Sequence, residues 1–136
     1  ISPNIVLWTW EDDALGEYLK SLLAVQELPV KTALPAHRTA GSIPLAARAE
    51  ELINHHQRRI EELSAIVRGW PGLTCYEVAA RMKWSIRAAS WDDFPPSQKY
   101  FAVCECMAHL QHMCCSGLAE RRTDANSVMR YYAKGK

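Results

Sequence analysis

The sequence has almost no net charge, since its 136 residues carry 16 Lys and Arg against 15 Asp and Glu, a formal net charge of +1. A nucleic-acid-binding domain usually shows a basic excess, so composition does not favour such a partner. No apolar run is long enough to span a bilayer, so we expect no membrane partner. No signal peptide is visible and the chain begins at Ile1 without a methionine, so we expect its start to lie upstream.

The sequence also lacks the spread of cysteines that a disulfide framework needs. A disulfide stabilises most when it closes a long loop, and here four of the five cysteines crowd one short segment. We therefore expect reduced thiols and a cytoplasmic location. The five are Cys75, Cys104, Cys106, Cys114 and Cys115.

The first third of the chain predicts one helix between two extended segments. Residues 4–10 are rich in β-branched and aromatic side chains and are typical of an extended segment. A helix is expected from a cap at Asp12 or Asp13 to about Glu27, because leucines recur there at helical spacing. Residues 30–34 predict a short strand, and residues 35–37 a loop after it.

The rest of the chain predicts three helices and a hairpin. An amphipathic helix of about six turns begins at Leu45 and ends near Gly69. Thr74, with Glu77 three residues later, has capping-box spacing and predicts a helix over residues 75–82. Residues 98–116 predict another helix, whose expected core positions are Phe101, Val103, Ala108, Leu110 and Met113, and residues 118–132 predict a hairpin. This order of elements is that of a winged helix-turn-helix.

Three stretches resemble the C-terminal part of the metallo-β-lactamase superfamily. Residues 13–22 (DALGEYLKSL) resemble the helix before the last catalytic strand of that fold. Residues 33–37 (ALPAH) resemble its strand-end motif L-P-G-H-G, with Ala36 and Arg38 in place of the two glycines. Residues 51–60, the segment after Thr74 and residues 102–110 resemble a winged-helix domain appended to one hydrolase branch.

The resemblance implies an α+β, mainly helical chain in two parts. Residues 1–44 would be the final helix and strand of the αββα catalytic domain, and residues 45–136 a winged-helix-like domain with a long leading helix. It further implies that His37 is the last ligand of a two-metal zinc site. The metals would lower the pKa of a bound water and polarise the scissile group. No His-x-His-x-Asp-His motif is present, so the remaining ligands are expected upstream.

The other histidines and the cysteines invite a second metal hypothesis, which their spacing does not favour. His55 and His56 are adjacent on a helix and point to different sides, and His56 falls on the apolar stripe, so a packed histidine is the better interpretation. Cys104 and Cys106 likewise diverge on a helix, and buried cysteine behaves as a small apolar residue. His109 and His112, with Cys114 and Cys115, complete this group.

Two functions stay open at this point. In the first, the chain is the C-terminal piece of a metal-dependent hydrolase, inactive by itself, whose appended domain shapes the substrate entrance or an interface. Its partners would then be the N-terminal catalytic domain and a second copy of the chain. In the second, it is a winged-helix module that contacts protein or nucleic acid. DNA is not expected, because residues 101–116 contain no Lys or Arg to attract phosphate.

Overall fold

A computed structural model describes residues 3–7, 9–37, 43–85 and 87–135 of the chain. The described elements run in the order α1 (Ala14–Gln26), α2 (Leu45–Gly69), α3 (Cys75–Arg81), α4 (Pro96–Cys115), β1 (Ala119–Thr123) and β2 (Met129–Ala133). The chain is therefore mainly helical, as predicted. None of the helices in these ranges is long and apolar enough to cross a membrane.

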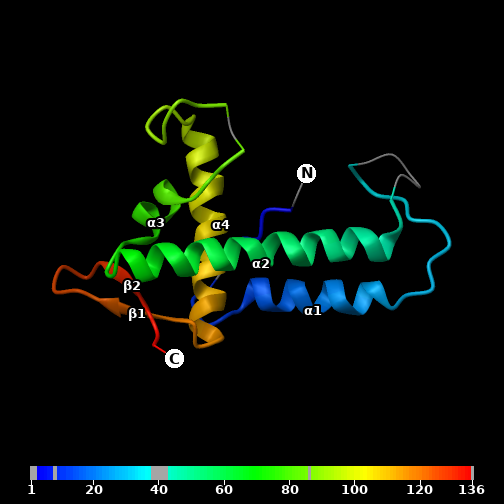
Figure 1. Cartoon of the computed structure of the whole chain (residues 1–136), viewed down its shortest axis with the longest axis horizontal. Coiled ribbons are helices and arrows are strands. Elements are labelled where there is room, and N and C mark those ends of the chain that lie inside the picture. Colours follow the sequence, from blue (N-terminus) through cyan, green and yellow to red (C-terminus); the bar gives the residue numbers. More distant parts are fainter. Residues whose placement is uncertain (1–2, 8, 38–42, 86, 136) are drawn as a thin grey trace.

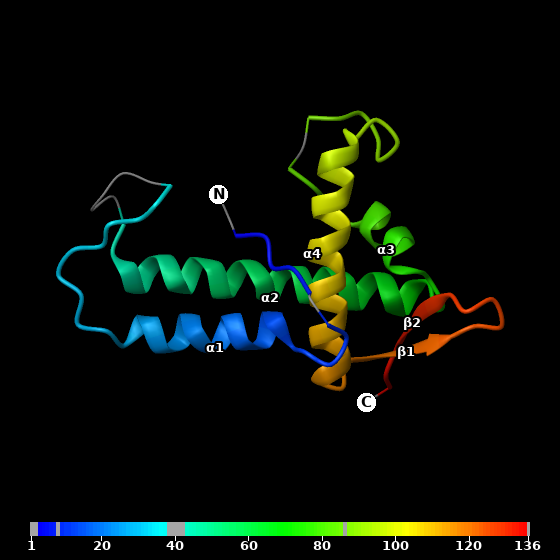
Figure 2. The same ribbon diagram turned by 180° about the vertical axis from the view of Figure 1, so that it is seen from behind.

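The helices form two arms. α1 packs along the first half of α2, while α4 crosses α2 steeply and carries α3 on one flank (Figures 1 and 2). The hairpin of β1 and β2 lies beside the end of α2 and the base of α4 (Figure 2). The crossing point of α2 and α4 is thus the centre of the molecule.

Local sequence signals set the helix boundaries. Asp13 caps α1, and its carboxylate accepts a hydrogen bond from the Gly16 backbone N–H at 2.9 Å. Thr74 and Glu77 form the predicted capping box at the start of α3. Pro96 occupies the first turn of α4, where its missing N–H costs nothing. The first backbone N–H groups of a helix have no partner within the helix, so residues that cap them or lack an N–H mark where a helix begins. These residues lie next to the helix ends in the sequence, which is why the sequence locates the helices well.

One residue outside the hairpin, Leu73, pairs with it. β1 and β2 pair antiparallel, with Arg121 opposite Tyr131. Leu73 makes an isolated bridge to Tyr131, and its carbonyl accepts from the Tyr131 backbone N–H at 3.0 Å. Gly72 precedes this bridge at φ 86, a left-handed conformation that favours glycine. The bridge ties the α2–α3 connection to the hairpin.

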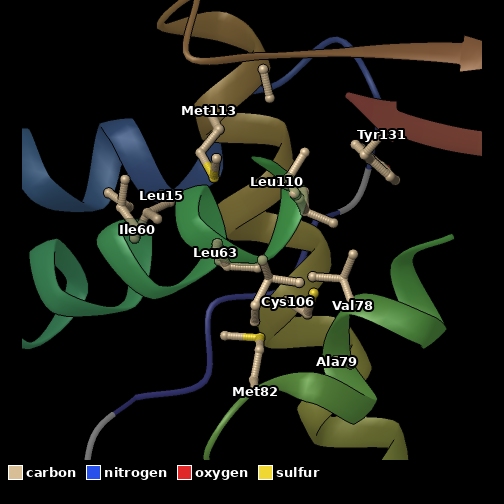
Figure 3. Packing of buried hydrophobic residues seen from close by; sticks show 13 residues of the cluster. Leu15, Ile60, Leu63, Val78, Ala79, Met82, Cys106, Leu110, Met113 and Tyr131 are labelled. Atoms are coloured by element: carbon tan, nitrogen blue, oxygen red, sulfur yellow. The ribbon is translucent and has the colours of Figure 1, made fainter. Parts of the chain in front are cut away.

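The main hydrophobic core contains residues of all six elements, and Figure 3 shows its packing. Leu15 of α1, Leu63 of α2, Val78 of α3 and Leu110 of α4 are all fully buried in it. Each such side chain contributes about 1.5–3 kcal/mol by leaving water. The other buried members are Ile60, Ile66, Val67, Ala79, Met82, Cys106, Met113, Ala119 and Tyr131. A smaller cluster of Leu22, Ala49 and Leu52 joins α1 to α2.

Two sequence predictions are wrong. Residues 30–34 form no strand. Their side chains are strand-like, but within the described chain the only strands are those of the hairpin, so no neighbouring backbone pairs with them. Phe101 is 48% exposed rather than buried, because it lies on the side of α4 that faces away from the core. Val103 is half-buried, whereas Ala108, Leu110 and Met113 are buried as expected.

Candidate functional site

His37, the predicted metal ligand, lies on the surface. It is exposed and lies in the irregular segment that follows α1. Within the described ranges, no group of three or more His, Cys, Asp or Glu residues is arranged to hold a metal ion. These residues therefore do not form a metal site by themselves. Arg38, the next departure from the family motif, lies outside the described residues.

The structure brings together two histidines that are far apart in the sequence. His56 of α2 and His109 of α4 are both buried, and His56 Nδ1 lies 3.0 Å from His109 Nε2. His109 Nδ1 lies 2.7 Å from the backbone carbonyl oxygen of Glu105. Burial lowers the pKa of His56 to about 4 and that of His109 to about 3. The prediction that His56 is a packed histidine with a hydrogen-bond partner is confirmed.

Arg59 forms an ionic network beside this pair. Its guanidinium bonds to Glu62 at 2.8 Å, to Glu105 at 3.2 Å and to the Lys83 carbonyl oxygen at 2.8 Å. The same group stacks over Trp84, 4.2 Å from the ring centroid. One side chain thus joins α2 to α4 and to the segment after α3.

Sequence reasoning missed Arg59, although a signal for it exists. Arg59 follows Leu52 and His56 at helical spacing and adjoins Ile60, so it occupies the apolar stripe of α2. A cation on a buried stripe needs an acid partner, because an unpaired buried charge is costly. Glu62 lies three residues on and has the spacing of a helical ion pair, but Glu105 could not be identified from the sequence because it lies 46 residues away.

His112 belongs to a second contact between helices. Its Nδ1 lies 3.0 Å from the carboxylate oxygens of Asp13, the residue that caps α1. Nearby, Gln111 and Arg121 both donate to the Trp10 carbonyl oxygen, at 2.7 Å and 3.1 Å. These bonds hold the start of α1 against the end of α4.

The cysteines do not assemble with the histidines. Cys104 and Cys106 are buried, and burial raises the pKa of the Cys106 thiol well above its usual value. Burial also raises the pKa of Cys114, while Cys115 is exposed. A thiol that resists ionisation is a poor metal ligand, because the thiolate is the form that binds. The burial of Cys104 and Cys106 supports the interpretation that both act as small apolar residues.

The segment between α3 and α4, which contains Trp84 and Trp91, packs against other parts of the chain. The Trp84 indole donates to the Ala79 carbonyl oxygen at 2.8 Å. Trp91 lies between Tyr76 and Phe94, with ring centroids 5.5 Å and 5.0 Å away. The segment after α3 is therefore part of the same body.

Known proteins match the chain in sequence and in structure. Residues 92–134 match the family model described as "Metallo-beta-lactamase-like, C-terminal domain". A β-lactamase domain protein from Burkholderia ambifaria has a similar structure, with a TM-score of 0.80 at 24% identity over 98% of this chain and 38% of that one. A metallo-β-lactamase family protein from Thermus thermophilus superposes with a TM-score of 0.74 at 29% identity, with the same coverage. No curated protein matches the sequence.

The extent of these matches locates the chain within the larger fold. The chain spans under two fifths of the length of either solved structure, yet almost all of it is matched. The family-model match lies in its C-terminal third and independently names a C-terminal domain. The predicted resemblance to the C-terminal part of metallo-β-lactamase family proteins is thus confirmed.

Proposed function

We propose that this chain is the C-terminal portion of a metal-dependent hydrolase and that its role is to complete and support the catalytic domain. The observation that carries the proposal is the match of 98% of the chain to metallo-β-lactamase family structures. Because the chain spans only 38% of them, the reaction and its substrate belong to the larger protein. On this proposal the 136 residues are inactive by themselves.

We propose His37 as one zinc ligand of that larger protein. A neutral imidazole is a common zinc ligand, and a catalytic zinc site needs three protein ligands. The described residues supply no such set, so the others would lie outside these 136 residues. The exposure of His37 is compatible with a ligand that faces a second part of the protein.

An apolar surface near His37 is the proposed contact with the catalytic domain. Leu23, Leu28, Val30 and Leu34 are each 44–82% exposed. A hollow of about 320 Å³ lies between the segment after α1 and the start of α2, lined in part by Leu28, Val30 and Leu45. Leu28 and Val30 line the same hollow, and exposed apolar side chains gathered in one place are typical of an interface. We propose that residues 1–44 complete the catalytic domain here.

Residues 45–136 are proposed to form a winged-helix-like domain. The order of α2, α3, α4 and the hairpin supports this. So does the bridge from Leu73 to Tyr131, because it pairs one residue between the first two helices with the hairpin that would be the wing. In the hydrolase this domain would shape the substrate entrance or an interface.

Comparing the chain with a longer protein tests the function. We would purify the 136-residue chain and the protein encoded by the complete open reading frame that contains it. Each would be assayed with zinc or manganese against a thioester, a chromogenic β-lactam and a phosphodiester. We expect metal-dependent turnover from the longer protein only, lost on His37→Ala. The substitution His55→Ala is the matched control, expected to retain turnover.

Two results would contradict the proposal. Metal-dependent turnover by the 136-residue chain above its own His37→Ala variant would show that it holds a site. Equal zinc content and activity in the longer protein with and without His37 would remove His37 from the ligands.

A further inference from the structure

We propose that the buried pair His56 and His109 is an acid-sensitive latch, which fastens α2 to α4 when both imidazoles are neutral and releases them when either is protonated. The inference is independent of the proposed function, since it concerns only contacts within the described chain. It rests on the pattern of donors and acceptors around the two rings.

The hydrogen bonds fix where the protons lie. The Glu105 backbone carbonyl can only accept, so His109 Nδ1 must carry the proton in the 2.7 Å contact. In the neutral ring His109 Nε2 is then an acceptor, and His56 Nδ1–H donates to it across 3.0 Å. His56 Nε2 is consequently a bare lone pair. It is buried and has no hydrogen-bond partner among the described residues.

Protonation of either ring is unfavourable in this arrangement of hydrogen bonds. A proton added to His56 would go to Nε2, where no acceptor awaits it among the described residues. A proton added to His109 would go to Nε2, and the bond from His56 would be lost unless His56 moved its own proton to Nε2, which has no acceptor among the described residues. In either case a buried cation would replace a satisfied neutral pair.

The surroundings make that cation more costly. On α2, His55 lies with its ring centroid 5.1 Å from that of His56, and Arg59 is a permanent cation close to both rings. From α1, the Tyr18 ring meets His56 edge-on at 5.6 Å. The Glu105 carboxylate on α4 could offset a charge, but it is bonded to Arg59. Burial, followed by these neighbours, keeps the pKa of both histidines far below 6.5.

The sign of the pH effect follows. Above the ordinary histidine pKa of about 6.5, both rings are neutral folded or unfolded, and the latch is intact. As the pH falls from there towards about 4, the two imidazoles are protonated in the unfolded chain but stay neutral in the folded chain. Each such imidazole raises the unfolding equilibrium constant by about tenfold per pH unit. The latch therefore weakens over this window.

The test uses the whole 136-residue chain. Nitrogen NMR of the imidazoles should show both rings neutral, each with its proton on Nδ1, down to about pH 5. Urea unfolding between about pH 7 and about pH 4 gives the pH dependence of the unfolding constant. His56→Asn and His109→Gln each replace one ring by an amide that keeps a similar hydrogen bond without titrating. Each substitution should make the unfolding equilibrium constant rise less steeply as the pH falls, by about tenfold per pH unit over part of this window.

His37→Gln is the matched control, because His37 is an exposed histidine outside the pair. It should leave the pH dependence of unfolding as in the parent chain. The latch is overturned if either ring of the folded parent titrates near the ordinary value of about 6.5, or if both amide variants unfold with the parent's pH dependence. Should a variant fail to fold, the NMR titration of the parent still decides.

Discussion

At the residue scale, Arg59 is a buried cation that joins three parts of the chain. Its side chain is 10% exposed, and it reaches Glu62 and Glu105 as well as the Lys83 carbonyl oxygen. Removing one member of a buried ionic network leaves its partners uncompensated, which costs more than the intact network contributes.

We predict that Arg59→Met lowers the free energy of unfolding by about 2–4 kcal/mol. Urea denaturation at neutral pH measures this value. Lys20→Met is the control, since Lys20 forms a surface pair with Glu17 in which the side chains are 73% and 71% exposed. Exposed pairs contribute little, so no measurable change is expected there. Equal effects of the two substitutions would mean that the Arg59 network does not stabilise the fold.

At the scale of elements, the start of α1 depends on a close approach that only glycine permits. A Cβ atom on Gly16 would overlap the Asp13 carboxylate, which caps α1 and accepts from His112 of α4. The same carboxylate thus begins one helix and attaches it to another. Gly69, at the end of α2, has open space around its Cα instead.

Opposite results are therefore predicted for two glycine substitutions. Gly16→Ala should lower the free energy of unfolding by about 1–2 kcal/mol, because the cap and the bond to His112 are lost together. Gly69→Ala should leave it unchanged or raise it by up to about 1 kcal/mol, since alanine favours helix. Thermal and urea unfolding of both variants would check the difference. A stabilising Gly16→Ala would show that Asp13 finds another position at no cost.

At the scale of the whole molecule, the proposed winged-helix arrangement raises the question of DNA binding. α4 contains one Lys and no Arg, and that residue, Lys99, bonds to the Asp92 carbonyl oxygen. The hairpin arginines have partners within the chain: Arg121 bonds to Gln111, Arg122 to Glu120 and Arg130 to Asp124. Phosphate contacts would have to compete with these bonds.

We predict that the chain does not bind duplex DNA appreciably at neutral pH and moderate salt. Phosphate attraction supplies most non-specific affinity, and the helix that would enter the major groove offers almost none. Fluorescence anisotropy with a mixed-sequence duplex at two salt concentrations measures the binding of the chain to DNA. Saturable micromolar binding with a steep salt dependence would instead favour a winged-helix binding module over a hydrolase portion.

The sequence by itself determined the elements whose signals are local. The cap at Asp13, the box of Thr74 and Glu77, and the apolar stripe of α2 each depend on residues a few positions apart. They located α1, α2 and α3 close to their observed bounds, and the sequence placed α4 and the hairpin as well. The sequence also suggested the family resemblance that the family model matches over residues 92–134.

Only the tertiary structure decided how distant residues meet. A strand needs a partner backbone, so the β-branched side chains of residues 30–34 could not make one where the described chain supplies none. Likewise, no periodicity could pair His56 with His109, 53 residues away, or Arg59 with Glu105. These contacts depend on how α4 crosses α2, which the packing of the whole core fixes and no local segment encodes.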